Sequence, residues 1–283
     1  MEKILIIGKG FLGNTTSIIA KTKNFQVFEA SQKSDIRIDI TNIESVENAV
    51  KKTSPDIILN CAALTQVDEI EENPKDAFEV NAYGAQNIAK ISSKYSSRLI
   101  HISTDSVFDG KKGNYLETDK PNPINEYGKS KQLGEKFVQE VSSDFIIIRT
   151  NFYGNNKEGK FLFNWILQNL QQNKRFAGFT NIFFNPLEIG NLSTILLELS
   201  RSDYNGILHI GSDKTYSKYK FAKIIAEKLG YDSDLVFEKA LEGGEFMAKR
   251  PENTSLNNHL FKKLIKDEPQ NLEIWLEKMK NSC

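Results

Sequence analysis

The chain has 283 residues, which is enough for one large α/β domain or for one domain with a smaller lobe. Its 37 basic and 37 acidic residues balance, and this argues against a nucleic-acid partner and against an anionic membrane. No apolar stretch reaches the roughly 18 residues that a membrane helix needs. Neither the two cysteines, Cys61 and Cys283, nor the three histidines have the spacing of metal ligands. We therefore expect a cytoplasmic protein with free thiols and no metal site.

Short apolar runs alternate with segments of helical period in the first half of the chain. The runs consist of consecutive Ile, Leu and Val residues, which indicates strands that are buried on both faces. We expect strands at 3–7, 25–28, 36–40, 56–60, 99–103 and 145–149. We expect helices at 11–22, 43–53, 74–94 and 126–142. This alternation predicts βαβ units and a Rossmann-like, doubly wound parallel sheet.

The pattern is less regular after residue 149. The sequence predicts a polar loop at 155–159, an irregular Phe-rich segment at 176–186 and a strand at 206–211. Further helices are expected at 160–173, 187–201, 217–229 and 271–280. Since no linker rich in Pro or Gly separates the two halves, we expect them to pack together. We predict a dinucleotide-binding domain over 1–150, to which later segments return, and a substrate-binding lobe made mainly of 151–283.

A glycine-rich turn of the form GxGxxG occupies residues 8–13, between a predicted strand and a predicted helix. The first glycine permits the tight turn, the second lets the backbone approach a pyrophosphate, and the third lets the helix pack on the strand. The helix N-terminus then favours the phosphate charge. The candidate cofactor contacts in this turn are Gly8, Gly10, Phe11, Leu12 and Gly13.

Glu29 follows Gly8 by about 20 residues, at the expected end of the second strand, where an acid binds the ribose hydroxyls of NAD. A carboxylate at this position also repels the 2′-phosphate of NADP. Ser31 and Lys33 are close enough in sequence to receive that phosphate instead. The sequence therefore favours NADH slightly and leaves NADPH open.

Two further strand ends are candidates for the cofactor site. Asp39 and Ile40 close the expected third strand, where they can hold the adenine edge. Cys61, Ala62 and Ala63 close the expected fourth strand, and such small residues let a cofactor lie across the strand ends.

The candidate chemistry lies between residues 99 and 131. Tyr127 and Lys131 have the i, i+4 spacing that puts both side chains on one face of a helix. A carbonyl reductase needs a proton donor, and lowering the tyrosine pKa from about 10 to near 7 requires nearby positive charge, for which we expect Lys131 and the oxidised nicotinamide. Thr104 follows an expected strand, so its hydroxyl can donate to the substrate oxygen. Together these residues predict a hydride-transfer site.

The sequence resembles the extended short-chain dehydrogenase/reductase superfamily and, within it, the dTDP-4-dehydrorhamnose reductases. The resemblance spans most of the chain and rests on the motifs at 60–68 (NCAALTQVD), 81–82 (NA), 103–110 (STDSVFDG), 116–119 (LETD), 125–131 (NEYGKSK), 134–135 (GE) and 250–257 (RPENTSLN). It implies reduction of the C4 ketone of a nucleotide-linked deoxysugar. It also implies that Thr104, Tyr127 and Lys131 are catalytic, that Asn81 orients the site, and that Thr65, Val67 and Arg250 lie near the sugar nucleotide.

The chain departs from this family's pattern in two places. The family's mid-chain Asp-Gln-x-Gly-x-Pro-Thr loop reads here as residues 181–187, NIFFNPL, which leaves the sugar and the base open. Thr15 occupies the position at which some members carry an acid for a Mg²⁺-bridged dimer, so a metal-bridged dimer is not expected, although a homodimer remains open.

Two alternative functions stay open, an epimerase and a regulatory subunit, whereas a dehydratase is not expected. A sugar-nucleotide dehydratase of this superfamily carries Thr-Asp-Glu where this chain has Thr104-Asp105-Ser106, so the missing Glu argues against it. A sugar-nucleotide epimerase has the same fold. A regulatory subunit like the methionine adenosyltransferase beta subunit would bind the dinucleotide without turnover, but both Tyr127 and Lys131 are retained here.

Overall fold

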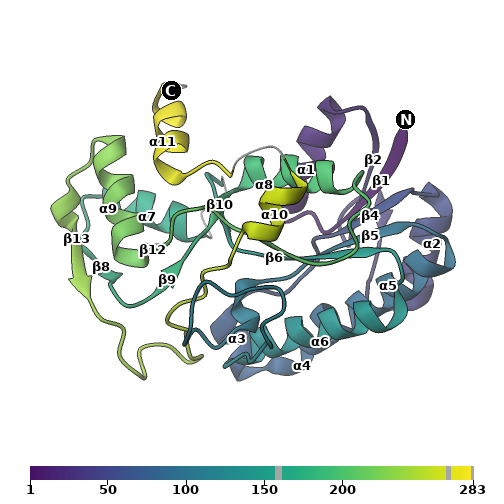
Figure 1. Ribbon diagram of the computed structural model, residues 1–283, viewed down its shortest axis with the longest axis horizontal. Helices are drawn as coiled ribbons and strands as arrows, with labels where there is room; N and C mark the ends of the chain where they lie inside the picture. Colours follow the sequence, from purple (N-terminus) through teal and green to yellow (C-terminus); the bar gives the residue numbers. More distant parts are fainter. Residues whose placement is uncertain (157–160, 266–268, 282–283) are drawn as a thin grey trace.

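A computed structural model describes residues 1–156, 161–265 and 269–281. Its centre is a seven-stranded sheet in the order β11-β6-β5-β4-β1-β2-β3, and all neighbouring strands are parallel (Figure 1). The strands are β1 (Glu2–Ile7), β2 (Phe25–Ser31), β3 (Ile36–Arg37), β4 (Ile57–Asn60), β5 (Arg98–Ile102), β6 (Phe145–Thr150) and β11 (Gly206–Ile210). The predicted doubly wound parallel sheet is confirmed.

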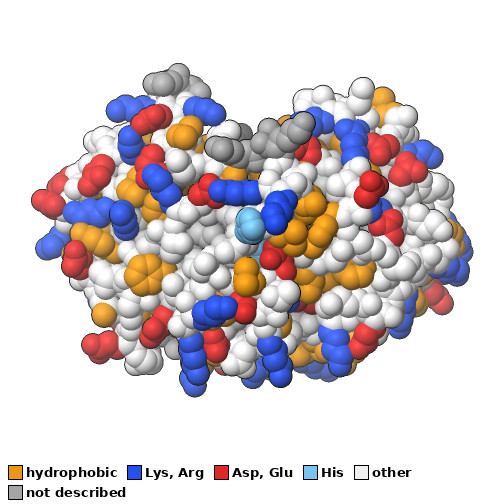
Figure 2. Space-filling view, in the orientation of Figure 1, with side chains coloured by type: hydrophobic (Ala, Val, Ile, Leu, Met, Phe, Trp, Pro, Cys, Tyr) orange, Lys and Arg blue, Asp and Glu red, His pale blue; other side chains and the backbone are white. Residues whose placement is uncertain are grey.

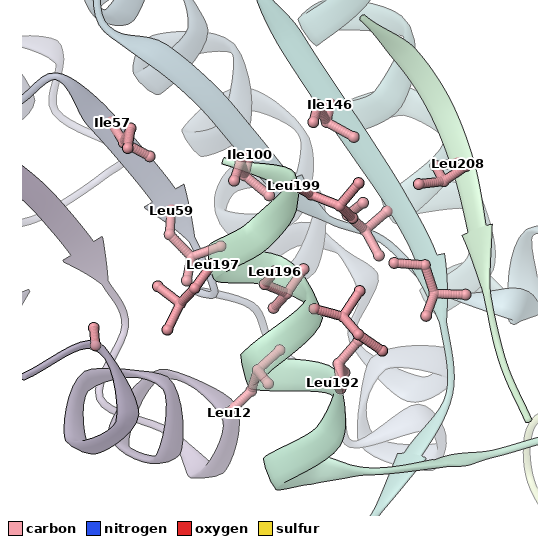
Figure 3. Packing of buried hydrophobic residues seen from close by; sticks show 14 of the residues in the cluster. Leu12, Ile57, Leu59, Ile100, Ile146, Leu192, Leu196, Leu197, Leu199 and Leu208 are labelled. Atoms are coloured by element: carbon pink, nitrogen blue, oxygen red, sulfur yellow. The ribbon is translucent and has the colours of Figure 1, made fainter. Parts of the chain in front are cut away.

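Helices cover both faces of the sheet (Figure 1). Helices α1 (Phe11–Thr22) and α8 (Ile189–Leu199) lie on one face, while α2 (Ile43–Thr53), α5 (Ala85–Lys94) and α6 (Glu126–Val141) lie on the other. Successive side chains of a strand point to opposite faces, so Ile4 and Ile6 pack towards α1 and α8, whereas Leu5 and Ile7 pack towards α2 and α5. Figure 3 shows leucines of α8 against the first of these faces.

The remaining segments form a lobe beside the strand ends (Figure 1). It contains three two-stranded sheets: β7 (Phe152–Tyr153) with β10 (Leu187–Glu188), β8 (Phe176–Phe179) with β13 (Val236–Lys239), and β9 (Phe183–Phe184) with β12 (Tyr216–Ser217). Its helices are α7 (Leu162–Gln171), α9 (Lys218–Leu229) and α11 (Leu272–Asn281), which pack around an aromatic core of their own. Helix α10 (His259–Leu264) returns to the sheet beside β11. The division into a 1–150 domain and a 151–283 lobe stays a prediction, and α8 and β11 lie beyond residue 150 yet belong to the sheet layers.

The structure differs from the sequence expectations in a few places. The Phe-rich segment 176–186 is not irregular, because β8 and β9 form there by pairing with strands that lie far along the chain. The third strand ends at Arg37, since the Asp39 carboxylate accepts hydrogen bonds from the backbone and hydroxyl of Thr41 and turns the chain. Part of the predicted loop 155–159, and the first residue of the helix expected at 160–173, fall outside the described residues.

The segment 74–94 is helical as expected, but its middle is wider than an α-helix. Helix α3 (Val67–Glu72) precedes it; α4 (Pro74–Ala77) leads into the π-helix η1 (Phe78–Gly84), and α5 follows without a break. Short 3-10 turns also occur at η2 (Asp105–Val107) and η3 (Ser233–Leu235). All helices in the described part of the chain are too short or too polar to cross a bilayer. On the face shown in Figure 2, basic and acidic side chains are interspersed, as the balanced composition predicts.

Candidate active site

The glycine turn of residues 8–13 joins β1 to α1 and has an open side. Gly8 has a φ of +100°, and a side chain there would come within 2.7 Å of the Ala62 nitrogen. A side chain at Gly13 would collide with the backbone of Gly8, so both glycines are required by the fold itself. Around Gly10, in contrast, nothing lies within 4 Å of where a Cβ would be. This free space at the N-terminus of α1 fits a pyrophosphate, so the turn fits a dinucleotide.

The two residues inside the turn have different surroundings. Leu12 is buried in the core under α8, so only its backbone is available to a cofactor (Figure 3). The Phe11 ring packs 5.2 Å from the ring of Phe161. Just after β4, next to the glycine turn, lie the half-buried residues Cys61, Ala62 and Ala63. The order of the strands reverses between β1 and β4, and open α/β sheets bind their ligands at such a switch point.

Glu29 does not stand at a strand end, which corrects the expectation. Strand β2 continues to Ser31, and Glu29 points towards α1. Its carboxylate lies 2.7 Å from Lys21 Nζ and 3.0 Å from Lys9 Nζ, and it accepts a hydrogen bond from Ser17. Bonds from Lys21, Ser17 and Lys9 lower the pKa of Glu29 to about 2. Since two lysines compensate this carboxylate, its repulsion of a 2′-phosphate is weakened.

We expect that removing Lys9 shifts the enzyme towards NADH. In Lys9→Met, Glu29 loses one of its two cationic partners and repels the 2′-phosphate of NADPH more strongly. A half-exposed ion pair contributes about 0.2–1 kcal/mol, so the ratio of kcat/KM for NADPH to that for NADH should fall about 1.5- to 5-fold. Glu29→Gln should change the ratio in the opposite direction. Equal ratios in all three proteins would separate Glu29 from cofactor choice.

Asp39 and Ile40 lie after β3 and offer a cofactor little side chain. The Asp39 carboxylate is already bonded to Thr41, at 2.7 Å from its hydroxyl, and Ile40 is buried in the core beside α2. The backbone groups and the second carboxylate oxygen of the exposed Asp39 remain for the adenine edge.

Thr104, Tyr127 and Lys131 come together at the carboxyl end of β5. Thr104 follows this strand and caps η2, where its hydroxyl accepts from the Ser106 nitrogen at 3.2 Å. Tyr127 and Lys131 lie on α6, which begins here because the Asn125 side chain caps it. Helix α6 can approach the Thr104 turn because Gly128 is small, and a side chain at Gly128 would collide with the backbone of Ser106. The sequence placed these three residues on one site, and the geometry agrees.

The pKa of Tyr127 is shifted in the direction opposite to the expected one. Burial raises it to about 12; a hydrogen bond with Thr104 lowers it and the Asp105 charge raises it. The phenol is therefore protonated at neutral pH in the protein alone. Lys131 is buried, its Nζ donates to the Ile102 carbonyl at 2.7 Å, and burial lowers its pKa to about 8. The expected depression of the Tyr127 pKa by Lys131 is absent because burial dominates.

Asn81 is held by other protein groups. Its amide pairs with both backbone groups of Leu64, at 2.8 and 2.9 Å, and donates to Ser130 Oγ at 3.0 Å. Asn81 thus connects the loop after β4 to the turn of α6 that carries Tyr127 and Lys131. Because the Asn81 side-chain amide is bonded to Leu64 and Ser130, its geometry is that of a residue that positions the site.

A cavity of about 500 Å³ opens beside this cluster, between the strand ends and the lobe. Asp105 and Ser106 line it next to Thr104, and its far wall is mostly aromatic. The aromatic lining residues are Trp165, Phe176, Phe179, Phe183, Phe184 and Phe246. Thr65 is exposed and Val67 half-buried, and neither lines this cavity.

Arg250 lines the cavity and is also paired. Its guanidinium lies 2.6 Å from the Asp68 carboxylate, donates to the Ala248 carbonyl at 3.1 Å and stacks 4.7 Å from the Phe246 ring. Arg250 thus lies at the cavity, and its expected place near the sugar nucleotide stays a prediction. Because the Arg250 guanidinium bonds to Asp68 and Ala248, only some of its N–H groups remain for a ligand.

Several polar residues of the cavity were not among the predicted site residues. Asp105 Oδ2 accepts from Asn151 at 3.1 Å and from Thr254 at 2.6 Å, so this buried carboxylate is fixed in place. Lys218 also lines the cavity. A lysine at the first position of a helix, where the dipole disfavours positive charge, is a sequence signal that could have drawn attention to it. Among the described residues no group of three or more His, Cys, Asp or Glu side chains could hold a metal ion.

The parallel sheet, the glycine turn and the Thr-Tyr-Lys cluster define an extended short-chain dehydrogenase/reductase. The chain matches the family described as RmlD substrate binding domain over residues 1–282, and it belongs to that family. The resemblance and the fold predicted from the sequence are thereby confirmed.

Two relatives are similar to this chain over most of their length. The dTDP-4-dehydrorhamnose reductase of Escherichia coli K12 is 31% identical over 271 residues, which are 91% of this chain and 90% of that protein. The probable low-salt glycan biosynthesis reductase of Haloferax volcanii is 34% identical over 226 residues, 78% of this chain and 75% of that protein.

Solved structures agree with the fold. A dTDP-4-dehydrorhamnose reductase of Bacillus anthracis in complex with NADP has a TM-score of 0.90 at 28% identity, covering 100% of this chain and 99% of that chain. A UDP-glucose 4-epimerase of Thermotoga maritima has a TM-score of 0.85 at 20% identity, over 99% of this chain and 97% of that one, and shares the fold alone.

Proposed function

We propose that this protein reduces the 4-keto group of a nucleotide-linked deoxysugar with NADH or NADPH. The observation that carries the proposal is the meeting of the Thr104 and Tyr127 side chains next to Lys131, at the edge of a cavity large enough for a sugar nucleotide. The Escherichia coli and Haloferax volcanii relatives, both more than 30% identical over most of the chain, carry the names of reductases, which supports this reaction over epimerisation or dehydration. The substrate is thus a nucleotide sugar, and its base and sugar are left to experiment.

The residues can perform the proton half of this reaction. The bound dinucleotide supplies the hydride that reaches C4 of the sugar. Tyr127, which is protonated because its pKa is high, donates its proton to the oxygen on C4 as negative charge develops there. The Thr104 hydroxyl donates to Asp105 in the protein alone, and we expect it to turn its single O–H to the same C4 oxygen when the substrate is bound. Lys131, which is largely charged at neutral pH, is held by the Ile102 carbonyl one helical turn after Tyr127, and solvent returns a proton to Tyr127 after the transfer.

The test is turnover. Purified protein is mixed with an enzymatically prepared dTDP-4-keto-6-deoxysugar, and oxidation of NADPH and of NADH is followed by absorbance. We expect steady oxidation with one alcohol formed per cofactor consumed. Binding of the cofactor without turnover on any 4-keto sugar nucleotide would instead favour the regulatory-subunit alternative. The homodimer and the cytoplasmic location remain predictions; light scattering on the purified protein tests the first.

Arg250 is expected to contribute to substrate binding. Arg250→Ala removes a cation that lines the cavity, so KM for the sugar nucleotide should rise about tenfold while the Kd for NADPH stays unchanged. Because Arg250 also holds Asp68, Asp68→Asn is the matched control: it weakens the pair and keeps the guanidinium in the cavity. If Asp68→Asn raises KM as much as Arg250→Ala does, then Arg250 serves to hold the loop and does not bind substrate.

A further inference from the structure

Lys218 is placed where a positive charge is locally unfavourable. It is the first residue of α9, so its charge lies at the positive end of the helix dipole. Its Nζ stands 3.1 Å from the centroid of the Phe184 ring, on the aromatic side of the cavity. Among the described residues its ammonium has no hydrogen bond and no ion pair. Burial lowers the pKa of Lys218 to about 7, and the Asp105 charge raises it.

Asp105 is not free to serve as a direct partner for this ammonium. Its two oxygens are occupied by hydroxyl and amide donors from Thr104, Ser106, Asn151 and Thr254. Among the described residues, the only other cation that lines the cavity is Arg250, which is paired with Asp68. Lys218 is therefore the cation of the cavity whose hydrogen-bonding capacity is unused, within the part of the chain that the structure describes.

We infer that Lys218 binds the diphosphate of the nucleotide substrate and sets the enzyme's affinity for it. An ammonium has three donors and suits phosphate oxygens as a point charge, while the aromatic wall around it suits a nucleoside. Lys218 and Arg250 line one cavity, so a diphosphate between them would meet two positive charges, and the sugar would point towards Asp105 and Thr104. The inference rests on the proposed function, because a nucleotide sugar must be the substrate.

The experiment measures binding without turnover. Thymidine diphosphate is titrated into the protein, and the fluorescence of Trp165, which lines the cavity and is one of the chain's two tryptophans, reports its binding. Lys218→Met removes the charge and keeps the apolar stem, and we expect its Kd to rise about ten- to a hundredfold. Lys218→Arg keeps the charge and should stay within about fivefold of wild type. Lys220→Met, an exposed lysine in the same turn of α9, is the matched control and should change nothing.

The Kd for NADPH tells whether a variant has lost only its phosphate-binding side chain or has lost its fold. The Kd for NADPH should be the same in all four proteins. An unchanged Kd for thymidine diphosphate in Lys218→Met overturns the inference, as do equal losses for both ligands or a wild type that does not bind thymidine diphosphate. If the diphosphate effect appears but no keto-sugar nucleotide is reduced, the proposed reaction fails and the role of Lys218 stands. If reduction occurs with an unchanged KM in Lys218→Met, the reaction stands and the role of Lys218 fails.

Discussion

Tyr127→Phe should bind both ligands and lose most of its turnover. The change removes only the phenol oxygen, and with it the proton that neutralises the oxygen on C4. General acid catalysis contributes about 10²- to 10⁴-fold, so kcat should fall on that scale. Because burial raises the pKa of Tyr127 to about 12, the wild-type phenol is the protonated form that the reduction requires. Single-turnover kinetics with excess enzyme measures the chemical step directly.

The control for this variant is Tyr83→Phe, which removes a hydroxyl from an exposed tyrosine whose ring centroid lies 5.5 Å from that of Phe137 on α6. Its kcat should match that of the wild type. A Tyr127→Phe enzyme within about threefold of wild type in the single-turnover rate would show that another group or a water donates the proton.

Arg149→Met should destabilise the fold strongly. Arg149 and Glu135 form an ion pair in which both side chains are 2% exposed, with Nη2 2.7 Å from Oε2. Ser103 also donates to Glu135, and His209 receives a hydrogen bond from Arg149. Removing one partner of a buried pair costs about 3–5 kcal/mol, because the remaining charge stays buried and unpaired. For a chain of this size we expect Tm to fall by on the order of 10 °C.

A double variant tests the physical reason. In Arg149→Met with Glu135→Leu both charges are gone and the volume is largely kept, so most of the lost stability should return. Urea denaturation of wild type, both single variants and the double variant gives the four free energies of unfolding. A single variant that loses less than about 1 kcal/mol, or a double variant as unstable as the sum of its parts, would contradict this account of the pair.

The sheet could be predicted from sequence because each of its strands carries its own signal. Runs such as Ile4–Ile7 are buried on both faces, and the segments between them have helical period, so a local pattern is sufficient. The strands β8 and β13 were missed because each is short and finds its partner about 60 residues away, where no local pattern reports the pairing. Strand β3 ends earlier than predicted because the Asp39 carboxylate accepts a hydrogen bond from the Thr41 backbone nitrogen, and this bond turns the chain away from the strand.

The candidate site was predictable where spacing fixes geometry. Tyr127 and Lys131 share a helical turn, and Thr104 follows a strand, so their meeting follows from the order of the elements. The surroundings were not predictable in the same way. Glu29 was expected at a strand end, bonded to the ribose, but Lys9 and Lys21 bind its carboxylate in the structure. The shift in the Tyr127 pKa depends on burial that the sequence does not report. Lys218 lines the cavity only because α9 packs against a wall built from other segments.

The residues proposed to react and the aromatic residues that line the cavity lie in different parts of the chain. The groups proposed to handle the proton lie between residues 104 and 131, on a turn and a helix anchored to the central sheet. The aromatic wall of the cavity comes from residues 165–246, carried by helices and small sheets with a core of their own. Substitutions in the wall can therefore change which molecule fits without moving the groups that react. Such an arrangement lets a family acquire new substrates by gradual drift, and it makes the wall the natural place to randomise when this enzyme is redesigned.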